Sequence, residues 1–321
     1  MSKKSMAARR QMREAAAEGH TAGGRQQARG RSKGRNYRRN ESQRPWGLIS
    51  GVVGVVAVFV IVVVVLELSL TGSLKQDAKV LPIPASLVNT ISTVPVKTLE
   101  QVKAGNINNT PLNIPASYKP VALSSQGLPE VAFVGAEYCP YCALQRWSLI
   151  IGLSRFGTWS GLHIIRSSVY DSPPNIPTFT FAYGAKFTSK YLVFSSHELQ
   201  SNVSINKDGS PYKTLQNVSG AVATAFTSID PTLGYPFVDY AGKYVQVGSE
   251  AVTSNVAALQ GLSWDQVAKR LRDPTSTVAQ EILGGANYVT AATCMLTGQK
   301  PGPVCTSSMI QALQVTLKAS K

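Results

Sequence analysis

The sequence predicts a mixed α/β domain, with helices on both faces of its sheet, that follows a single membrane-spanning helix. Three observations support this prediction. Residues 47–66 are uncharged and mostly apolar, a short apolar strand leads into a Cys-x-x-Cys motif at 139–142, and strand-like and helix-like patterns alternate through the rest of the chain. A chain of 321 residues is long enough for two domains, although its first part is too polar to join a core.

The first 45 residues form a basic tail that we expect to be disordered and cytoplasmic. They contain thirteen Lys or Arg and three Glu, within a chain whose formal net charge is +15, and almost no large apolar residue. Such a segment cannot bury enough apolar surface to offset its chain entropy. Segments rich in Arg and Gly can bind RNA, but only Tyr37 lies among the arginines. Membrane topology and anionic headgroups explain the charge more simply, so no nucleic acid is expected as a partner.

Residues 46–68 are predicted to be an uncleaved transmembrane helix. The twenty apolar residues would span about 30 Å, which is the hydrocarbon thickness of a bilayer. Trp46 would lie at one interface, and the basic tail before it places the N-terminus in the cytoplasm and the rest of the chain outside it. A cleaved signal peptide is the alternative, but its apolar region would be shorter and an Ala-x-Ala site would follow. We therefore expect a single-pass protein of the cell membrane that contacts the bilayer through residues 46–68.

A spacer at 69–80 is expected to connect this helix to one extracytoplasmic domain at 81–321. The domain begins with a stretch rich in Pro, Ser, Asn and Thr that continues to residue 129. Pro and Gly punctuation within it predicts short helices at 81–93 and 94–105, followed by an extended piece within 112–123.

The domain is organised around residues 131–147, which read VAFVGAEYCPYCALQRW. The apolar run at 131–134 predicts a buried strand, and the apolar residues after the motif recur at helical spacing. Cys139 would lie at the helix N-terminus, where unpaired N–H groups and the macrodipole stabilise a thiolate, and Cys142 one turn inside. Pro140 suits the first turn because the N–H that it lacks would have no partner there. This layout predicts a redox pair with Cys139 as nucleophile and Cys142 as resolving thiol, while a structural disulfide or half a zinc site is the alternative.

Further elements are predicted after the motif helix, which should end near residue 156. A strand is expected at 162–169, and two segments rich in aromatic and β-branched residues predict a hairpin, 178–183 with 190–194. Later patterns predict a helix at 218–225, strands at 237–240 and 243–247, a helix capped by Ser263 and a long helix at 275–296.

A second cysteine pair, Cys294 and Cys305, flanks the turn-forming sequence TGQKPGPV. Disulfides persist outside the cytoplasm, so we expect a structural disulfide that stabilises the domain by roughly 3 kcal/mol. A redox relay with the first pair is an alternative. A zinc site built from all four cysteines is disfavoured by the spacing, and no metal is expected.

The other candidate residues are few. Glu137 is the one acidic residue beside the motif in the sequence, and it could transfer protons for the resolving thiol or be an ordinary turn carboxylate. His20, His163 and His197 do not form a catalytic constellation. No Ser–His–Asp set, HExxH motif or phosphate-binding loop is present in the sequence, so no cofactor is predicted.

Two blocks of the sequence, GAEYCPYCALQRWSLIIGLSRFG and ATCMLTGQKPGPVC, resemble an uncharacterised family of membrane-anchored prokaryotic thioredoxin-like proteins, a domain-of-unknown-function family. The resemblance covers roughly residue 81 to the C-terminus. A wider similarity, to thioredoxin-fold disulfide oxidoreductases, rests on Cys139, Cys142 and Pro236. It implies a thioredoxin-like mixed sheet with an insertion of more than ninety residues between Cys142 and Pro236.

The resemblance also implies roles for particular residues. A cis bond at Tyr235-Pro236 would precede the hairpin and face the motif, and both residues would bind the backbone of a partner, together with Pro140 and Tyr141. The implied activity is thiol–disulfide exchange on exported cysteine-containing proteins, with a membrane protein that could donate or accept the electrons. The sequence CPYC leaves the direction of electron flow open. A binding or scaffold module that keeps the fold and uses both disulfides structurally is the alternative.

Overall fold

The computed structural model of the chain describes residues 75–114, 121–249 and 253–320. The predicted basic tail, the predicted transmembrane helix and most of the spacer lie outside these residues. Within the part of the chain that is described, no helix is both long enough and apolar enough to cross a membrane.

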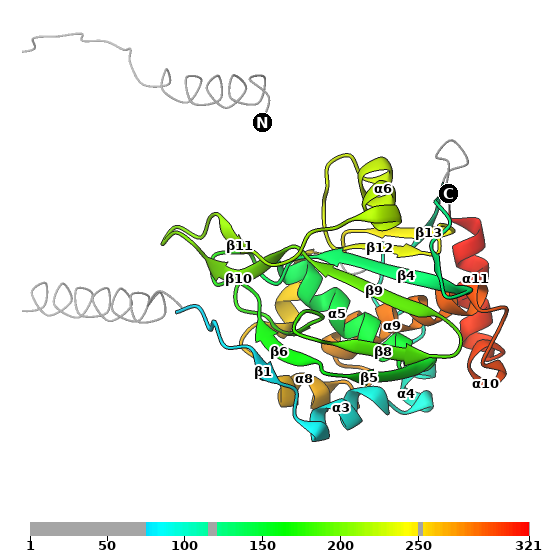
Figure 1. Cartoon of the computed structure of the whole chain (residues 1–321). Helices are drawn as coiled ribbons and strands as arrows, with labels where there is room; N and C mark the ends of the chain where they lie inside the picture. The colour runs from blue at the N-terminus through cyan, green and yellow to red at the C-terminus, as the bar shows by residue number, and fades with distance from the viewer. Residues whose placement is uncertain (1–74, 115–120, 250–252, 321) are drawn as a thin grey trace, which may run out of the picture. The chain divides into compact units, whose positions relative to one another are not determined.

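A mixed sheet lies at the centre of the domain (Figure 1), as the sequence predicted. Strand β4 (Leu128–Gly135) pairs antiparallel with β12 and parallel with β9. The parallel partner was not predicted. The strands run in the order β2 (Leu112–Asn113), β13 (Tyr244–Val247), β12 (Phe237–Tyr240), β4 and β3 (Ser124–Ser125), with β9 (Val193–Glu198) also beside β4.

Strand β4 is apolar throughout its second half because both of its faces are buried. Side chains alternate between the two faces of a strand. Phe133 points into the large core on one face, while Ala132 and Val134 belong to a smaller apolar cluster on the other, together with Phe226 and Phe237. This arrangement explains why the run at 131–134 has no polar residue.

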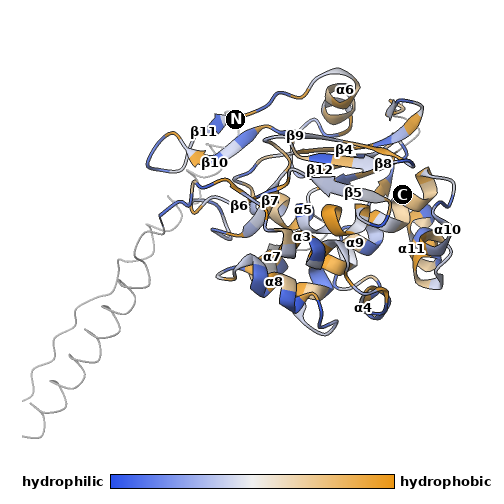
Figure 2. Ribbon diagram, turned by 60° about the horizontal axis from the view of Figure 1, so that its bottom comes forward, coloured by the Kyte–Doolittle hydropathy of each residue, from blue (hydrophilic) through white to orange (hydrophobic). Residues whose placement is uncertain are grey.

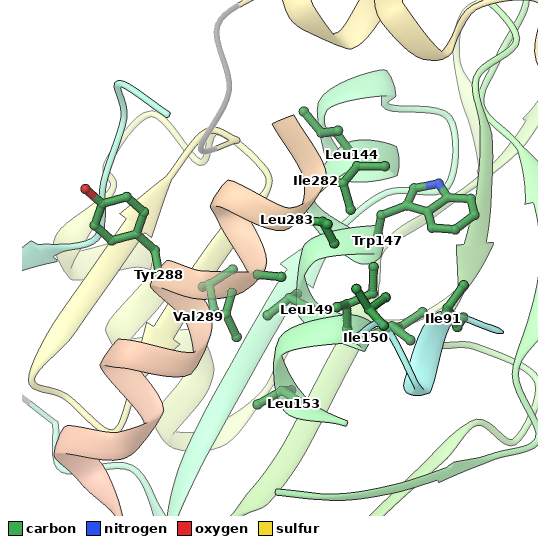
Figure 3. Close-up of a cluster of buried hydrophobic side chains, with 14 of the residues drawn as sticks. Ile91, Leu144, Trp147, Leu149, Ile150, Leu153, Ile282, Leu283, Tyr288 and Val289 are labelled. Carbon is green, nitrogen blue, oxygen red and sulfur yellow. The ribbon is translucent and has the colours of Figure 1, made fainter. Parts of the chain in front are cut away.

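Helices cover both faces of the sheet (Figure 2). Helix α6 (Gly220–Ile229) supplies Phe226 to the smaller cluster. On the opposite face, α5 (Pro140–Leu153) packs along α9 (Thr277–Leu296), and Figure 3 shows Leu149 of α5 beside Val289 of α9. Gly152 permits this close approach, because a Cβ atom there would lie 2.8 Å from the carbonyl oxygen of Ala286 and from Cβ of Val289.

The remaining helices match most of the sequence predictions. Helix α8 begins at the predicted cap, where the side chains of Ser263 and Gln266 each accept a hydrogen bond from the backbone N–H of the other residue. The other helices are α3 (Ala85–Ser92), α4 (Val96–Val102), α7 (Thr253–Val256), α8 (Trp264–Arg270), α10 (Gly302–Cys305) and α11 (Ser308–Ala319), with a short 3₁₀ turn at Ala257–Leu259.

The predicted hairpin of 178–183 with 190–194 is wrong. These segments are strands, but β7 pairs with β6, β8 pairs with β5, and β9 joins β4. Aromatic and β-branched residues indicate strands without specifying their partners, and here Trp159, Phe187 and Phe194 from three strands pack together. The strands of this region are β1 (Leu81–Pro82), β5 (Gly157–Ser160), β6 (His163–Arg166), β7 (Pro177–Thr180), β8 (Lys186–Ser189), β10 (Gln200–Ser204) and β11 (Tyr212–Thr214).

Candidate functional site

The Cys-x-x-Cys motif lies at the junction between β4 and α5. Cys139 is the N-cap of this fourteen-residue helix, and its Sγ accepts a hydrogen bond from the backbone N–H of Cys142 at 3.2 Å. Pro140 occupies the first helical position. Both cysteines are free thiols, and Cys139 is 5% exposed while Cys142 is fully buried. The geometry therefore matches the predicted order of a more accessible and a more buried thiol.

Gly135 brings the end of β4 against the buried thiol. A Cβ atom at this position would lie 3.1 Å from Sγ of Cys142 and 2.4 Å from the ring of Phe133. A larger residue would therefore displace either the sulfur or the ring, so this glycine is needed for close approach.

The loop before β12 meets the motif from the other side. Its Tyr235-Pro236 bond is cis, and the carbonyl oxygen of Tyr235 lies 3.9 Å from Sγ of Cys139. Tyr141, between the two cysteines, is half-buried. The structure thus brings together Cys139, Pro140, Tyr141 and the Tyr235-Pro236 pair, which lie more than ninety residues apart in the sequence.

Three tyrosines form a connected group next to Cys139. The hydroxyl groups of Tyr138 and Tyr235 are 2.7 Å apart, and the ring of Tyr138 stacks on Tyr212 with centroids 4.0 Å apart. Tyr235 also donates to the side chain of Gln200. Tyr212 and Gln200 belong to the β10–β11 hairpin, which was not predicted, so sequence reasoning missed this group.

Glu137 is buried rather than a solvated turn carboxylate. Burial raises its pKa to about 7, and Glu198 adds to the rise, whereas Thr180, Arg146 and Asn202 oppose it. Among the described residues, neither of its carboxylate oxygens accepts a hydrogen bond of ordinary geometry. A carboxyl group with this pKa can both accept and donate protons near neutral pH.

A buried ion pair lies behind the motif. Arg146 donates from Nε and Nη2 to the two carboxylate oxygens of Glu198, at 2.8 and 2.6 Å, and from Nη2 to the carbonyl oxygen of Ala136 at 2.8 Å. Neither side chain is exposed. Sequence reasoning gave neither residue a role. The signal in the sequence was Arg146 itself, a charged residue among mostly apolar residues of a predicted helix.

The thiol of Cys142 is affected by these groups. Burial and the sulfur of Cys139 raise its pKa, and the positive charge of Arg146 is the largest influence that lowers it. Desolvation raises the pKa of this thiol and the Arg146 cation lowers it, so the balance of the two effects determines how readily Cys142 ionises.

A disulfide joins Cys294 to Cys305, with Cα atoms 5.5 Å apart, and it connects the end of α9 to α10. This pairing was predicted and is confirmed. Helices α5 and α9 run in the same direction, since Ser148 contacts Ile282 while Gly152 contacts Ala286 further along. At the rise of an α-helix, Cys142 and Cys294 are then separated by about 27 Å. Direct exchange between the two pairs within one molecule is therefore excluded.

The two described histidines lie on strands. His163 and His197 are on β6 and β9, and a ring nitrogen of each lies near a backbone carbonyl. His20 lies outside the described residues. In the described ranges, no group of three or more His, Cys, Asp or Glu side chains could hold a metal ion.

Fold and site together define a mixed α/β protein with a buried ion pair behind a free dithiol at a helix start. A family model described as a domain of unknown function (DUF929) matches residues 115–295, more than half of the chain, so the protein belongs to this family. The match includes the motif, the β5–β11 region and the Tyr235-Pro236 loop. Neither a comparison with curated proteins nor one with solved structures gives a match.

Proposed function

We propose that this protein is a thiol–disulfide oxidoreductase whose sheet, motif helix and Tyr235-Pro236 loop are arranged as in thioredoxin-like proteins. One observation carries the proposal. The sulfur of Cys139 caps a long helix, accepts the N–H of Cys142 and lies 3.9 Å from the carbonyl oxygen of Tyr235. A helix N-terminus favours the thiolate, which is the reactive form in disulfide exchange.

The proposed reaction has two exchanges. The thiolate of Cys139 attacks one sulfur of a partner disulfide, so that a mixed disulfide forms and the other partner sulfur leaves as a thiolate and takes up a proton. Cys142, once deprotonated, attacks Sγ of Cys139, the mixed disulfide breaks, and the second partner sulfur leaves. Two electrons pass to the partner and a Cys139–Cys142 disulfide remains. The reverse sequence oxidises a dithiol partner.

Glu137 is proposed to accept the proton that Cys142 loses. Its pKa of about 7 means that both protonation states are populated near neutral pH, and its burial keeps bulk water from replacing it. Once the disulfide has formed, the carboxyl group gives this proton to the second partner sulfur, which leaves as a thiolate.

The partner is proposed to bind as an extended segment beside Cys139. The Tyr235 carbonyl offers an acceptor next to the reacting sulfur, and Pro236, Pro140 and Tyr141 form the adjoining surface. Exported cysteine-containing proteins fit this role, because the topology predicted from the sequence would put the domain outside the cytoplasm. A membrane protein would exchange electrons with the dithiol, and residues 46–68 would hold the domain at the bilayer.

A pair of cysteine variants tests the activity. Cys139→Ser should abolish turnover of a fluorogenic disulfide-bonded peptide in dithiothreitol, whereas Cys294→Ser should lower stability and retain turnover in the folded fraction. Both variants are compared at a temperature where circular dichroism shows them folded. Equal loss of turnover in the two would overturn the division between a reactive and a structural pair.

The low exposure of Cys139 favours a second candidate, a binding or scaffold module in which neither pair reacts. For that function, iodoacetamide should modify Cys139 of the native protein no faster than Cys142. For the oxidoreductase, modification of Cys139 should be much faster and should not require unfolding.

A further inference from the structure

The buried pair of Arg146 and Glu198 has no part in the exchanges just described. Placing two charges in an apolar interior carries a large desolvation cost for each ion, and apolar residues of similar size often stabilise a protein equally well. The pair nevertheless lies directly behind the reacting sulfurs, with both side chains fully buried. A contribution to stability therefore does not explain why an ion pair lies at this position.

Arg146 is fixed relative to Cys142 by three contacts. The two residues are four apart on α5, so their side chains occupy the same face of the helix. Glu198 holds the guanidinium from the end of β9, and the carbonyl oxygen of Ala136 accepts from Nη2 in the turn that leads to Cys139. The ring of Phe133 lies 5.6 Å from the guanidinium carbon. The cation is thus held rigidly behind the motif.

One donor of this cation is unused. Nη1 of Arg146 is buried and has no hydrogen-bond partner in the described part of the chain. A buried guanidinium N–H without an acceptor is costly, so an acceptor that forms during the reaction would relieve that cost. A thiolate at Cys142 is such an acceptor.

We propose that Arg146 stabilises negative charge on Sγ of Cys142 directly when this sulfur attacks the mixed disulfide, and that Glu198 is the positioning residue that holds the guanidinium in place. The inference rests on the proposed function. It concerns the second exchange only, in which Cys142 is the attacking sulfur.

Several other groups also face the thiol of Cys142 and will contribute to its titration. They are Cys139 and Arg146 from the motif helix, Tyr138 from the turn and Tyr235 from the loop before β12, while Glu137 and Glu198 act on the guanidinium of Arg146. Of the charged side chains, Arg146 most favours the thiolate, in agreement with its place on the same helix face.

The test separates the two exchanges with 5,5′-dithiobis(2-nitrobenzoate) as the disulfide. The reduced full-length protein, kept in detergent because of residues 47–66, releases one thionitrobenzoate when Cys139 attacks and a second when Cys142 displaces the first adduct. Stopped-flow absorbance gives both rates as a function of pH. The Cys142→Ser variant, which can give only the first release from the motif, calibrates the amplitudes.

The informative variant is Arg146→Met combined with Glu198→Gln, because it removes the cation without leaving a buried charge unpaired. We expect the first release to stay within about threefold of the unmodified protein, the second to slow by about tenfold or more, and its pH midpoint to rise by about one unit. Arg155→Met is the matched control, since Arg155 lies beyond the far end of α5 and its Nη1 also has no partner among the described residues. It should change neither rate.

An unchanged second release in the folded double variant would overturn the proposal. If the double variant does not fold, the single variant Glu198→Gln provides the test of the proposal. An Arg146 without its counter-ion should lower the pH midpoint of the second release, and an unchanged midpoint would overturn the proposal. Failure of the underlying function differs from all of these outcomes, because the unmodified protein would then give no second release and no Cys139–Cys142 disulfide by mass spectrometry.

Discussion

Replacing Glu137 by Gln removes a carboxyl group that titrates at about pH 7 next to the motif. Its pKa rises from the ordinary 4.5 to about 7, mainly through burial. Between these two values the native state holds a proton that the unfolded state has lost, so stability falls as the pH rises. The contribution is fully present below about pH 4.5 and is lost as the pH passes through about 7. The pKa shift corresponds to a loss of roughly 3 kcal/mol in the free energy of unfolding as the pH rises, and the Glu137→Gln variant should not show this loss.

Asp239 provides the matched control. It is also buried, and its pKa rises from 3.8 to about 7 for the same main reason. It lies on β12 opposite Ala132, where Oδ1 accepts the backbone N–H of Gly242, a contact that Asn can keep. Asp239→Asn should therefore flatten the pH dependence of stability as Glu137→Gln does, without touching the thiols.

The assay is urea unfolding of both variants and the unmodified protein at about pH 5 and about pH 8, followed by the two-release thiol assay. Both variants should lose less free energy of unfolding than the unmodified protein between these pH values. Only Glu137→Gln should slow the second release. Unchanged pH dependence in the Glu137 variant, or equal slowing by both variants, would refute the assignment of Glu137 to proton transfer.

Three further predictions concern stability. Joint replacement of Cys294 and Cys305 by Ser should lower the free energy of unfolding by about 3 kcal/mol, measured by urea unfolding, while both thionitrobenzoate releases persist. Gly152→Ala should place a methyl group against Val289 and cost about 1–3 kcal/mol, seen as a lower Tm, and an unchanged Tm would contradict the tight α5–α9 contact. Ser263→Ala should cost about 1 kcal/mol by loss of the cap of α8, and no change in unfolding would show that the capping box contributes nothing.

The parts of the structure that were predicted correctly depend on neighbours in the sequence. The side chains of residues 131–134 alternate between two apolar faces of the sheet. Ser263 caps α8 together with Gln266, which lies three residues later in the sequence. Strands β12 and β13 pair with each other and are connected by a short turn. The order of Cys139 and Cys142 along α5 also follows from local spacing. Each of these features can be recognised within a short window.

The parts that were missed depend on residues far apart in the sequence. Glu198 reaches Arg146 because β9 pairs in parallel with β4, with Gly135 opposite Glu198, and strand patterns do not specify this partner. The stacking of Tyr138 on Tyr212 depends in the same way on the β10–β11 hairpin. Glu137 was singled out as a candidate from its place beside the motif, but its burial could not be read from a turn sequence.

The measurement that tests the central claim most directly is a redox titration of the full-length protein in dithiothreitol buffers. Alkylation followed by mass spectrometry reports the state of each cysteine. We predict that Cys139 and Cys142 convert reversibly between dithiol and disulfide at potentials where Cys294–Cys305 stays oxidised. If the first pair forms no disulfide, or if both pairs are reduced together, the motif is not a redox centre and the oxidoreductase proposal is contradicted.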